Sequence, residues 1–205
     1  MSAPLFADDI LFFQRLLRAD GLYTAKLDGK WGPKTEKAAK AFEEASAEIR
    51  LATGSFDTRS EANLATLALP VQQLARSFLN RVLESGMLVR IISGTRTYAE
   101  QDALFRKGRF GNPGPRVTNA RGGQSNHNFG IAWDIGVFTT TGGYVTEGPP
   151  YKRAAKLGRA GQEDAIEWGG DWTSFVDLPH FQWALDVPID EWRPRFEAGT
   201  WRWPT

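Results

Sequence analysis

Apolar residues recur at helical spacing in three stretches of the first third of the chain. The first stretch starts behind Asp8, a residue suited to a helix N-cap, and ends at Gly21. The second starts at Pro33, which suits the first turn of a helix, and the third at residues 58–61, Thr-Arg-Ser-Glu, which have capping-box spacing. The apolar faces comprise Ile10, Phe13, Leu16, Leu17, Ala38, Ala39, Phe42, Leu64 and Leu67. The pattern predicts a three-helix module over residues 1–69.

Residues 70–205 mix helical and strand-like patterns. Residues 70–86 carry apolar positions at helical spacing, and the β-branched run 88–92 predicts a strand. The capping-box sequence Thr-Tyr-Ala-Glu at 97–100 predicts a helix that reaches Lys107. We therefore expect a second domain with an α+β fold, in which a small antiparallel sheet is flanked by helices.

A second strand is predicted at residues 131–137, where small or polar residues alternate with large apolar ones. Ala132, Asp134 and Gly136 share one face, so the Asp134 carboxylate is expected to project away from the core. The preceding stretch, 108–126, is rich in glycine, proline and asparagine and is long for an ordinary connection. It is therefore predicted to be a functional loop.

Composition narrows the classes of function. Hydrophobic residues make up 41% of the chain and charged residues 24%, which is typical of a globular protein. The 25 Lys and Arg residues nearly balance the 24 Asp and Glu residues, so no nucleic-acid partner is expected. There is no cysteine, so a metal ion must be held by nitrogen and oxygen ligands.

The sequence also bears on localisation. It contains no apolar run near the roughly 20 residues that cross a bilayer, so no transmembrane segment is expected. Its first nine residues lack the basic and apolar regions of a secretory signal. We therefore expect a protein that is made in the cytoplasm without a Sec signal peptide.

The two histidines of the chain each lie near a carboxylate. His127 is followed by Asp134, and Asp177 precedes His180 by three residues. Two imidazoles and one carboxylate leave the fourth position of a tetrahedral zinc ion open for water, as in catalytic zinc sites. Asp177 is the best-placed general base for that water. Spacing alone leaves open the alternative that these residues are merely hydrogen-bonded parts of the structure.

Five short motifs mark residues 10–42. The Asp28-Gly29-x-Trp31-Gly32-Pro33 string is the most specific part, because packing alone does not select these residues together. The motifs resemble the peptidoglycan-binding domain of cell-wall hydrolases, which implies a wall-binding role for the module; a helical cap without a ligand is the alternative. The motifs are Phe13-Gln14-Arg15-Leu16-Leu17, Gly21-Leu22-Tyr23, Leu27-Asp28-Gly29, Trp31-Gly32-Pro33-Lys34-Thr35 and Ala38-Ala39-Lys40-Ala41-Phe42.

A second resemblance covers about residues 70–185. The string Ser125-x-His127-x-x-Gly130-x-Ala132-x-Asp134 resembles the signature of the VanY-type D-alanyl-D-alanine carboxypeptidases and of the related L-alanyl-D-glutamate endopeptidases of phage endolysins. Upstream, Ser93-Gly94-Thr95-Arg96-Thr97, followed by Gln101 and Leu104, is similar to the Ser-Gly-Tyr-Arg-Ser element of this family. Thr95 departs from the family pattern, because an aromatic residue is usual there.

The resemblance implies a role for each matching residue. The implied zinc ligands are His127, Asp134 and His180, with Asp177 as catalytic acid and base. Arg96 is implied to stabilise the oxyanion or a substrate carboxylate, and Ser125 to contact the substrate.

Alternatives remain for two of these roles. Glu167 and Asp171 are further candidates for the base, and many relatives have glutamate at the position of Asp177. Arg96 could instead form a surface salt bridge with Glu100. The aromatic residues Trp168, Trp172, Phe181 and Trp183 are expected in the core and receive no catalytic role.

The implied function is a zinc-dependent peptidoglycan hydrolase that cleaves the stem peptide. The Trp-Gly-Gly-Asp-Trp segment at 168–172 and the Asp-x-Pro-His-Phe-Gln ending at 177–182 favour the L-alanyl-D-glutamate bond over D-alanyl-D-alanine carboxypeptidase activity. A catalytically silent zinc-binding protein, as among hedgehog-like relatives, is a rival that Asp177 and Arg96 argue against. The expected protein is a monomer that binds the bacterial stem peptide. A phage or prophage lysin that reaches the wall after release fits the expected absence of a Sec signal.

Overall fold

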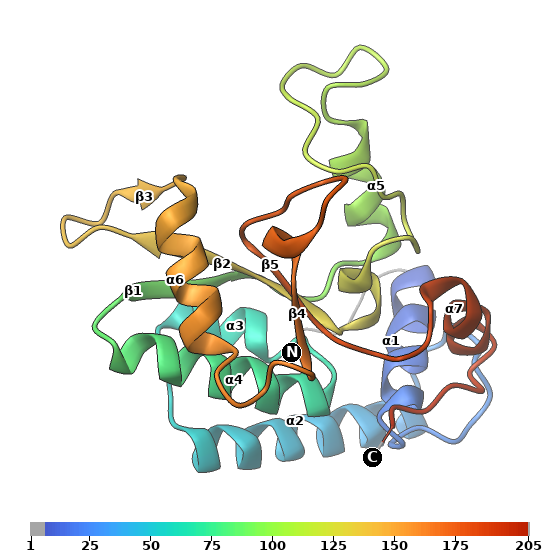
Figure 1. Cartoon of the computed structure of the whole chain (residues 1–205). Helices are drawn as coiled ribbons and strands as arrows, with labels where there is room; N and C mark the ends of the chain where they lie inside the picture. The colour runs from blue at the N-terminus through green and yellow to red at the C-terminus, as the bar shows by residue number, and fades with distance from the viewer. Residues whose placement is uncertain (1–6, 205) are drawn as a thin grey trace. The chain divides into compact units, whose positions relative to one another are not determined.

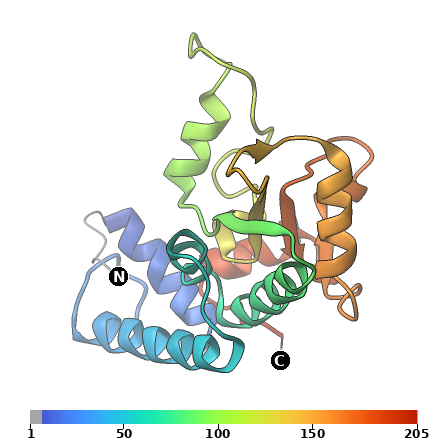
Figure 2. The same cartoon turned by 90° about the vertical axis from the view of Figure 1, so that its left-hand side faces the viewer.

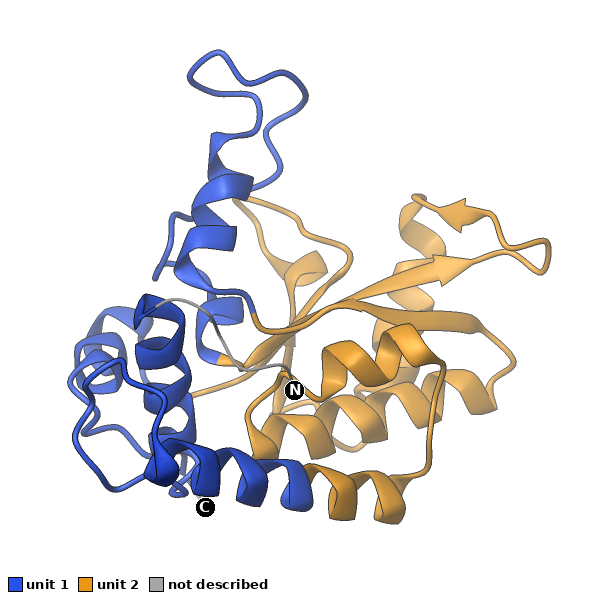
Figure 3. Cartoon of the chain, turned by 180° about the vertical axis from the view of Figure 1, so that it is seen from behind, with its two compact units in different colours: residues 1–45, 96–129, 187–205 blue, residues 46–95, 130–186 orange. Residues whose placement is uncertain are grey.

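The computed structural model describes residues 7–204, which form two compact units (Figures 1 and 3). Unit 1 consists of the described parts of residues 1–45, 96–129 and 187–205, and unit 2 consists of residues 46–95 and 130–186. Each unit therefore combines segments that are far apart in the sequence.

Unit 2 is built on an antiparallel sheet. Of the described residues, five strands pair in the order β1-β2-β5-β4, with β3 added to β2. Helices accompany this small sheet, which confirms the predicted α+β fold class. The strands are β1 (Leu88–Ser93), β2 (Ala132–Phe138), β3 (Tyr144–Val145), β4 (Ile166–Trp168) and β5 (His180–Trp183).

Aromatic residues form the core of unit 2. The ring of Phe78 lies 4.5 Å from that of Phe181 on β5 and 6.0 Å from that of Trp133 on β2, and all three residues are fully buried. Gly158 allows this packing, because a Cβ there would lie 2.2 Å from the Phe78 ring. Helices α3 (Thr58–Leu64) and α4 (Leu69–Glu84) lie beside β1 (Figure 2). The helices wholly within unit 2 are α3 (Thr58–Leu64), α4 (Leu69–Glu84) and α6 (Gly148–Gly158), and the short 3-10 helix η2 (Gly169–Asp171) follows β4.

This core determines which side of the sheet is free for polar chemistry. Adjacent residues of a strand point to opposite faces. Because Trp133 and Phe181 point into the core, their neighbours Asp134 and His180 point to the other face. That face of the sheet carries the candidate site.

Unit 1 has an aromatic core of its own. Phe129 packs edge-on against Trp192 at 4.3 Å and Phe196 at 5.2 Å between ring centroids, and Trp201 and Trp203 surround Trp192. Its elements are α1 (Ala7–Ala19), the first part of α2 (Pro33–Thr53), α5 (Tyr98–Arg106), the 3-10 helix η1 (Asn126–Phe129) and α7 (Ile189–Glu197). The C-terminal residues therefore pack around η1.

Most predicted helices and strands lie where the sequence pattern placed them. Helix α2 begins at Pro33, and Thr97 and Glu100 form the predicted capping box of α5. Helix α1 already includes Asp8, so the prediction that this residue is the N-cap is wrong.

The predicted capping box at the start of α3 is wrong, because the helix begins one residue after Asp57, which caps it. Asp57, and not Thr58, is the N-cap, and its carboxylate accepts the backbone N–H groups of Arg59 and Ser60, both at 3.2 Å. Glu61 accepts the N–H of Phe56 at 2.8 Å, one residue before the cap. An aspartate accepts hydrogen bonds more strongly than a threonine, which favours the earlier start.

The predicted division into two domains at Leu69 remains a prediction, as does wall binding by residues 1–69. Helix α4 begins at Leu69, while α2 contributes residues to both compact units. Within residues 7–204, no helix has both the length and the apolar character needed to span a bilayer.

Candidate active site

His127 lies in η1, where the amide of Asn128 holds the backbone. This amide is fully buried; its oxygen accepts the N–H of Gly123 at 2.9 Å, and its nitrogen donates to the carbonyls of Arg96 at 2.9 Å and Thr97 at 3.2 Å. The N–H of Arg96 in turn donates to the carbonyl of His127 at 2.9 Å. These bonds fix the backbone from which the His127 ring projects. The sequence analysis did not identify Asn128, because the two carbonyls to which its nitrogen donates belong to residues about 30 positions earlier.

Asp134 and His180 face each other across neighbouring strands. They are directly paired in the antiparallel register of β2 and β5. Oδ1 of Asp134 lies 3.3 Å from Nδ1 of His180, and their side chains are only 15% and 8% exposed. Two rigid strands therefore fix the carboxylate and the imidazole relative to each other.

The environment of His180 favours positive charge at this position. Burial is the largest single influence and acts to lower the pKa of its ring, but the hydrogen bond and negative charge of Asp134, the hydrogen bond of Gln182 and the charge of Asp177 together outweigh it. The pKa of His180 is consequently raised above its ordinary value. Such an environment attracts a proton or a metal cation.

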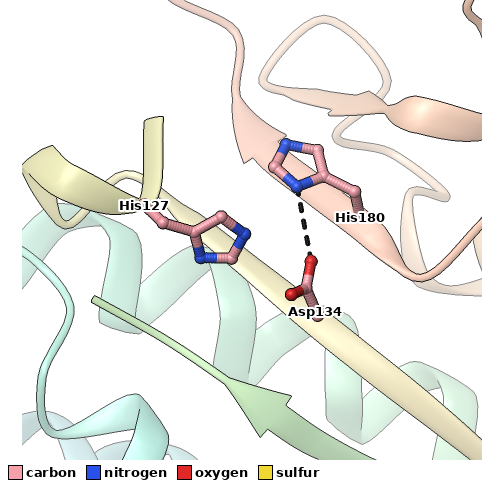
Figure 4. Close-up of side chains that lie close together, drawn as sticks. All are labelled: His127, Asp134 and His180. Atoms are coloured by element: carbon pink, nitrogen blue, oxygen red, sulfur yellow. Dashed lines mark ion pairs between the residues drawn. The ribbon is translucent and has the colours of Figure 1, made fainter. Parts of the chain in front are cut away.

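One potential ligand atom from each of His127, Asp134 and His180 lies within 4.8 Å of the other two. Figure 4 shows both rings and the carboxylate directed toward a common space. Two imidazole nitrogens and one carboxylate oxygen are a donor set that zinc accepts, with one position left for water or substrate. The residues present therefore fit a catalytic zinc ion.

Asp177 lies on the segment that leads into β5. Its N–H donates to the carbonyl of Gly169 at 2.9 Å, and its own carbonyl accepts the N–H of His180 at 3.2 Å. The residue is half-buried, and its negative charge is one of the influences on the pKa of His180. Asp177 is thus attached to the backbone of one candidate ligand, while a role as base remains a prediction.

Gly169 allows the segment around Asp177 to approach η2. A Cβ at this position would lie 2.6 Å from the carbonyl oxygen of Asp177 and 3.1 Å from the Cβ of His180. We expect Gly169→Ala to push both residues out of place and to lower kcat/KM about 10²-fold on the stem peptide that the sequence motifs imply as substrate, since small misplacements of reacting groups are costly. Gly32→Ala is the matched control, because a Cβ there meets no atom within 4 Å. Equal activity of the two variants would contradict this reading of Gly169.

The two alternative bases have other partners. Asp171 forms an ion pair with Nη1 of Arg159 at 2.9 Å, and its side chain is 56% exposed. Glu167 accepts a hydrogen bond from Nε2 of Gln182 at 2.8 Å and another from the indole N–H of Trp172. Neither carboxylate has the backbone connection to His180 that Asp177 has.

The aromatic residues near these carboxylates differ in how far they are buried. Trp168 and Phe181 are buried, as expected for core residues. Trp172 and Trp183 are half-buried, and the Trp172 ring lies 5.0 Å from the His180 ring. The expectation that Trp172 belongs to the core is therefore wrong.

Arg96 and Ser125 flank the segment that carries His127. Nη1 of Arg96 donates to Oε1 of Gln101 at 3.3 Å, and the N–H of Ser125 donates to Oδ1 of Asn128 at 3.4 Å. Glu100, the alternative partner of Arg96, accepts the N–H of Thr97 in the capping box at 2.7 Å. Both Arg96 and Ser125 are half-buried, and their substrate contacts remain predictions.

The comparisons with known proteins match the part of the chain that carries the candidate site. The family described as D-alanyl-D-alanine carboxypeptidase matches residues 118–183, which include the three candidate ligands and Asp177. The chain is 33% identical over 123 residues to the peptidoglycan L-alanyl-D-glutamate endopeptidase CwlK of Bacillus subtilis (strain 168), which covers 55% of this chain and 70% of CwlK.

Two further relatives carry similar names. The L-alanyl-D-glutamate peptidase of Listeria phage A118 is 31% identical over 132 residues, which cover 63% of this chain and 42% of the phage protein. The crystal structure of the Serratia marcescens L-Ala D-Glu endopeptidase ChiX is similar with a TM-score of 0.52 and 25% identity, over 67% of this chain and 92% of ChiX.

Proposed function

The chain belongs to the peptidase family of the L-alanyl-D-glutamate endopeptidase CwlK, and from this membership we propose that it is a zinc-dependent peptidoglycan hydrolase that cleaves the stem peptide between L-alanine and D-glutamate. The predicted resemblance of residues 70–185 to this family is thereby confirmed. The observation that carries the proposal is the cluster of His127, Asp134 and His180 inside the matched region. The names of three relatives support the choice of bond.

In this proposal His127, Asp134 and His180 hold the zinc ion. When bound, zinc lowers the pKa of a coordinated water toward neutrality and polarises a peptide carbonyl. The histidines would bind as neutral imidazoles, so zinc would compete with protons for His180, whose pKa is raised above its ordinary value.

We assign proton transfer to Asp177 and stabilisation of negative charge to Arg96. The Asp177 carboxylate accepts the proton of the attacking water and then delivers it to the leaving amine of D-glutamate. The Arg96 guanidinium binds the developing oxyanion or a substrate carboxylate, and Ser125 contacts the substrate beside it.

The proposal is tested by the termini of the products. A defined muropeptide is incubated with the zinc-loaded protein, and the fragments are identified by mass spectrometry. We expect a new carboxyl terminus at L-alanine and a new amino terminus at D-glutamate, with activity that disappears on chelation and returns with zinc. Release of D-alanine would instead identify a carboxypeptidase. A zinc-loaded protein that leaves the muropeptide intact would be a silent binder.

The wall-binding role of residues 1–69 is part of the same proposal. Tethering raises the effective concentration of an enzyme at an insoluble polymer without changing its chemistry. The Trp31 ring of the peptidoglycan-binding motif is half-buried and stacks on Phe13 at 6.0 Å.

We expect Trp31→Ala to weaken co-sedimentation with purified sacculi about tenfold, equivalent to ~1.4 kcal/mol. Cleavage of a soluble stem peptide should stay within about twofold of the unmodified protein. Leu51→Ala, at an 83% exposed position of α2, is the control for loss of a surface apolar group. A parallel loss of both activities would show that Trp31 is structural.

A further inference from the structure

We propose that Gln182, Glu167 and Trp172 select the ring nitrogen through which His180 binds the metal. This inference deepens the proposed function and rests on zinc binding at His127, Asp134 and His180. The three residues act as positioning residues, because they reach the metal only through the His180 ring.

The strand register brings these side chains into one row. Asp134 is paired with His180 between β2 and β5, and Glu167 is paired with Gln182 between β4 and β5. His180 and Gln182 are two residues apart on β5 and therefore share a face. The row thus crosses three strands on the face opposite the aromatic core.

The donor and acceptor groups along this row can be assigned from hydrogen-bond chemistry. The Glu167 carboxylate only accepts hydrogen bonds, so Gln182 must direct its NH2 group toward it, and Nε2 of Gln182 lies 2.8 Å from Oε2 of Glu167. The amide oxygen of Gln182 then faces His180, where Oε1 lies 2.9 Å from Nε2 of the ring. An amide oxygen cannot donate, so Nε2 of His180 must carry the hydrogen.

The tautomer of His180 follows from this direction. With a hydrogen on Nε2, the lone pair of the neutral ring is on Nδ1, which is the nitrogen 3.3 Å from Asp134. Metal-binding histidines commonly have their second nitrogen fixed by such a partner. Glu167 therefore acts on the proposed metal site through Gln182.

Trp172 contacts two members of this row. Its indole N–H donates to Oε1 of Glu167, which holds the second carboxylate oxygen. Its ring also lies 5.0 Å from the His180 ring, inclined at 44°. One side chain thus restrains both Glu167 and the imidazole.

The wild-type protein provides the first test. In a ¹⁵N NMR spectrum of the zinc-loaded full chain, we expect the His180 ring to show a directly bonded hydrogen on Nε2 and a metal-bound Nδ1. A hydrogen on Nδ1 with zinc on Nε2 would overturn the proposal. This measurement needs no variant and no substrate.

Zinc affinity in variants provides the second test, by competition with a chelator. We expect Gln182→Leu to weaken zinc binding by about 10–100-fold, the usual effect of losing an outer partner of a metal-binding histidine. Glu167→Gln should also weaken it, because the amide of Gln182 would no longer be oriented by a carboxylate. Gln73→Leu and Glu163→Gln remove matching groups at exposed positions of unit 2 and should leave the affinity unchanged.

The two tests separate this inference from the proposed function. Zinc affinities of Gln182→Leu and Glu167→Gln within twofold of wild type would overturn the inference, even if the protein cleaves the stem peptide. Conversely, an Nε2–H tautomer with weakened zinc binding in the variants would support it even if the zinc-loaded protein cleaved no muropeptide. Thermal unfolding of each variant controls for a loss of folding.

Discussion

His127→Ala and His180→Ala are each expected to lose stoichiometric zinc and, with it, all measurable hydrolysis of a stem peptide. Each change removes one of the three proposed protein ligands, and two ligands hold zinc much more weakly than three. His180→Ala also leaves the Asp134 carboxylate, which is 15% exposed, without the imidazole 3.3 Å away. The measurement is the zinc content per protein after gel filtration, together with the rate on a soluble muropeptide.

A control separates ligand loss from general damage. Asp186→Ala changes an exposed acidic residue shortly after β5 and should retain both zinc and activity. Near-full zinc occupancy in either histidine variant would refute the assignment of that residue as a ligand. Circular dichroism should show that the histidine variants remain folded, because strand pairing and the aromatic core are unchanged.

Asp177→Asn should retain zinc and lose about 10²–10⁴-fold in kcat, the usual contribution of general acid and base catalysis. The substitution keeps the volume of the side chain and the backbone bonds to Gly169 and His180. Asp177→Glu should keep part of the rate, since it retains a carboxylate that can accept and return a proton. Zinc content and kcat are measured on the same preparations.

The outcomes for Asp177 lead to different conclusions. Release of zinc from Asp177→Asn would place this residue at the metal, and the base would then be sought at Glu167 or Asp171. Full activity with full zinc would remove Asp177 from the mechanism. Asp186→Asn is the matched control; it makes the same change at an exposed position after β5 and should stay active.

Much of the fold was predictable because local chemistry determined it. The alternation of residues 131–137 identified β2, and the Thr97 capping box identified the start of α5. The three candidate ligands were also accessible from the sequence, since the chain has only two histidines and both lie in recognisable motifs. In these cases the signal lies within a few consecutive residues.

The residues that the sequence did not identify depend on distant partners. Asn128 acts by bonding to Arg96 and Thr97, about 30 residues earlier. Gln182 and Glu167 meet only because β4 and β5 pair in one particular register. Periodicity predicts that a strand exists, but it does not say which residue will face which.

The aromatic packing around Phe129 has a consequence for the order in which the chain is synthesised. Phe129 lies two residues after His127, yet Trp192 and Phe196, which pack against it, are made more than 60 residues later. A growing chain that has already exposed His127 outside the ribosome therefore still lacks the rings that anchor η1. We conclude that η1 gains these aromatic contacts only after Trp192 and Phe196 have been synthesised, so the proposed metal site cannot be completed before that point.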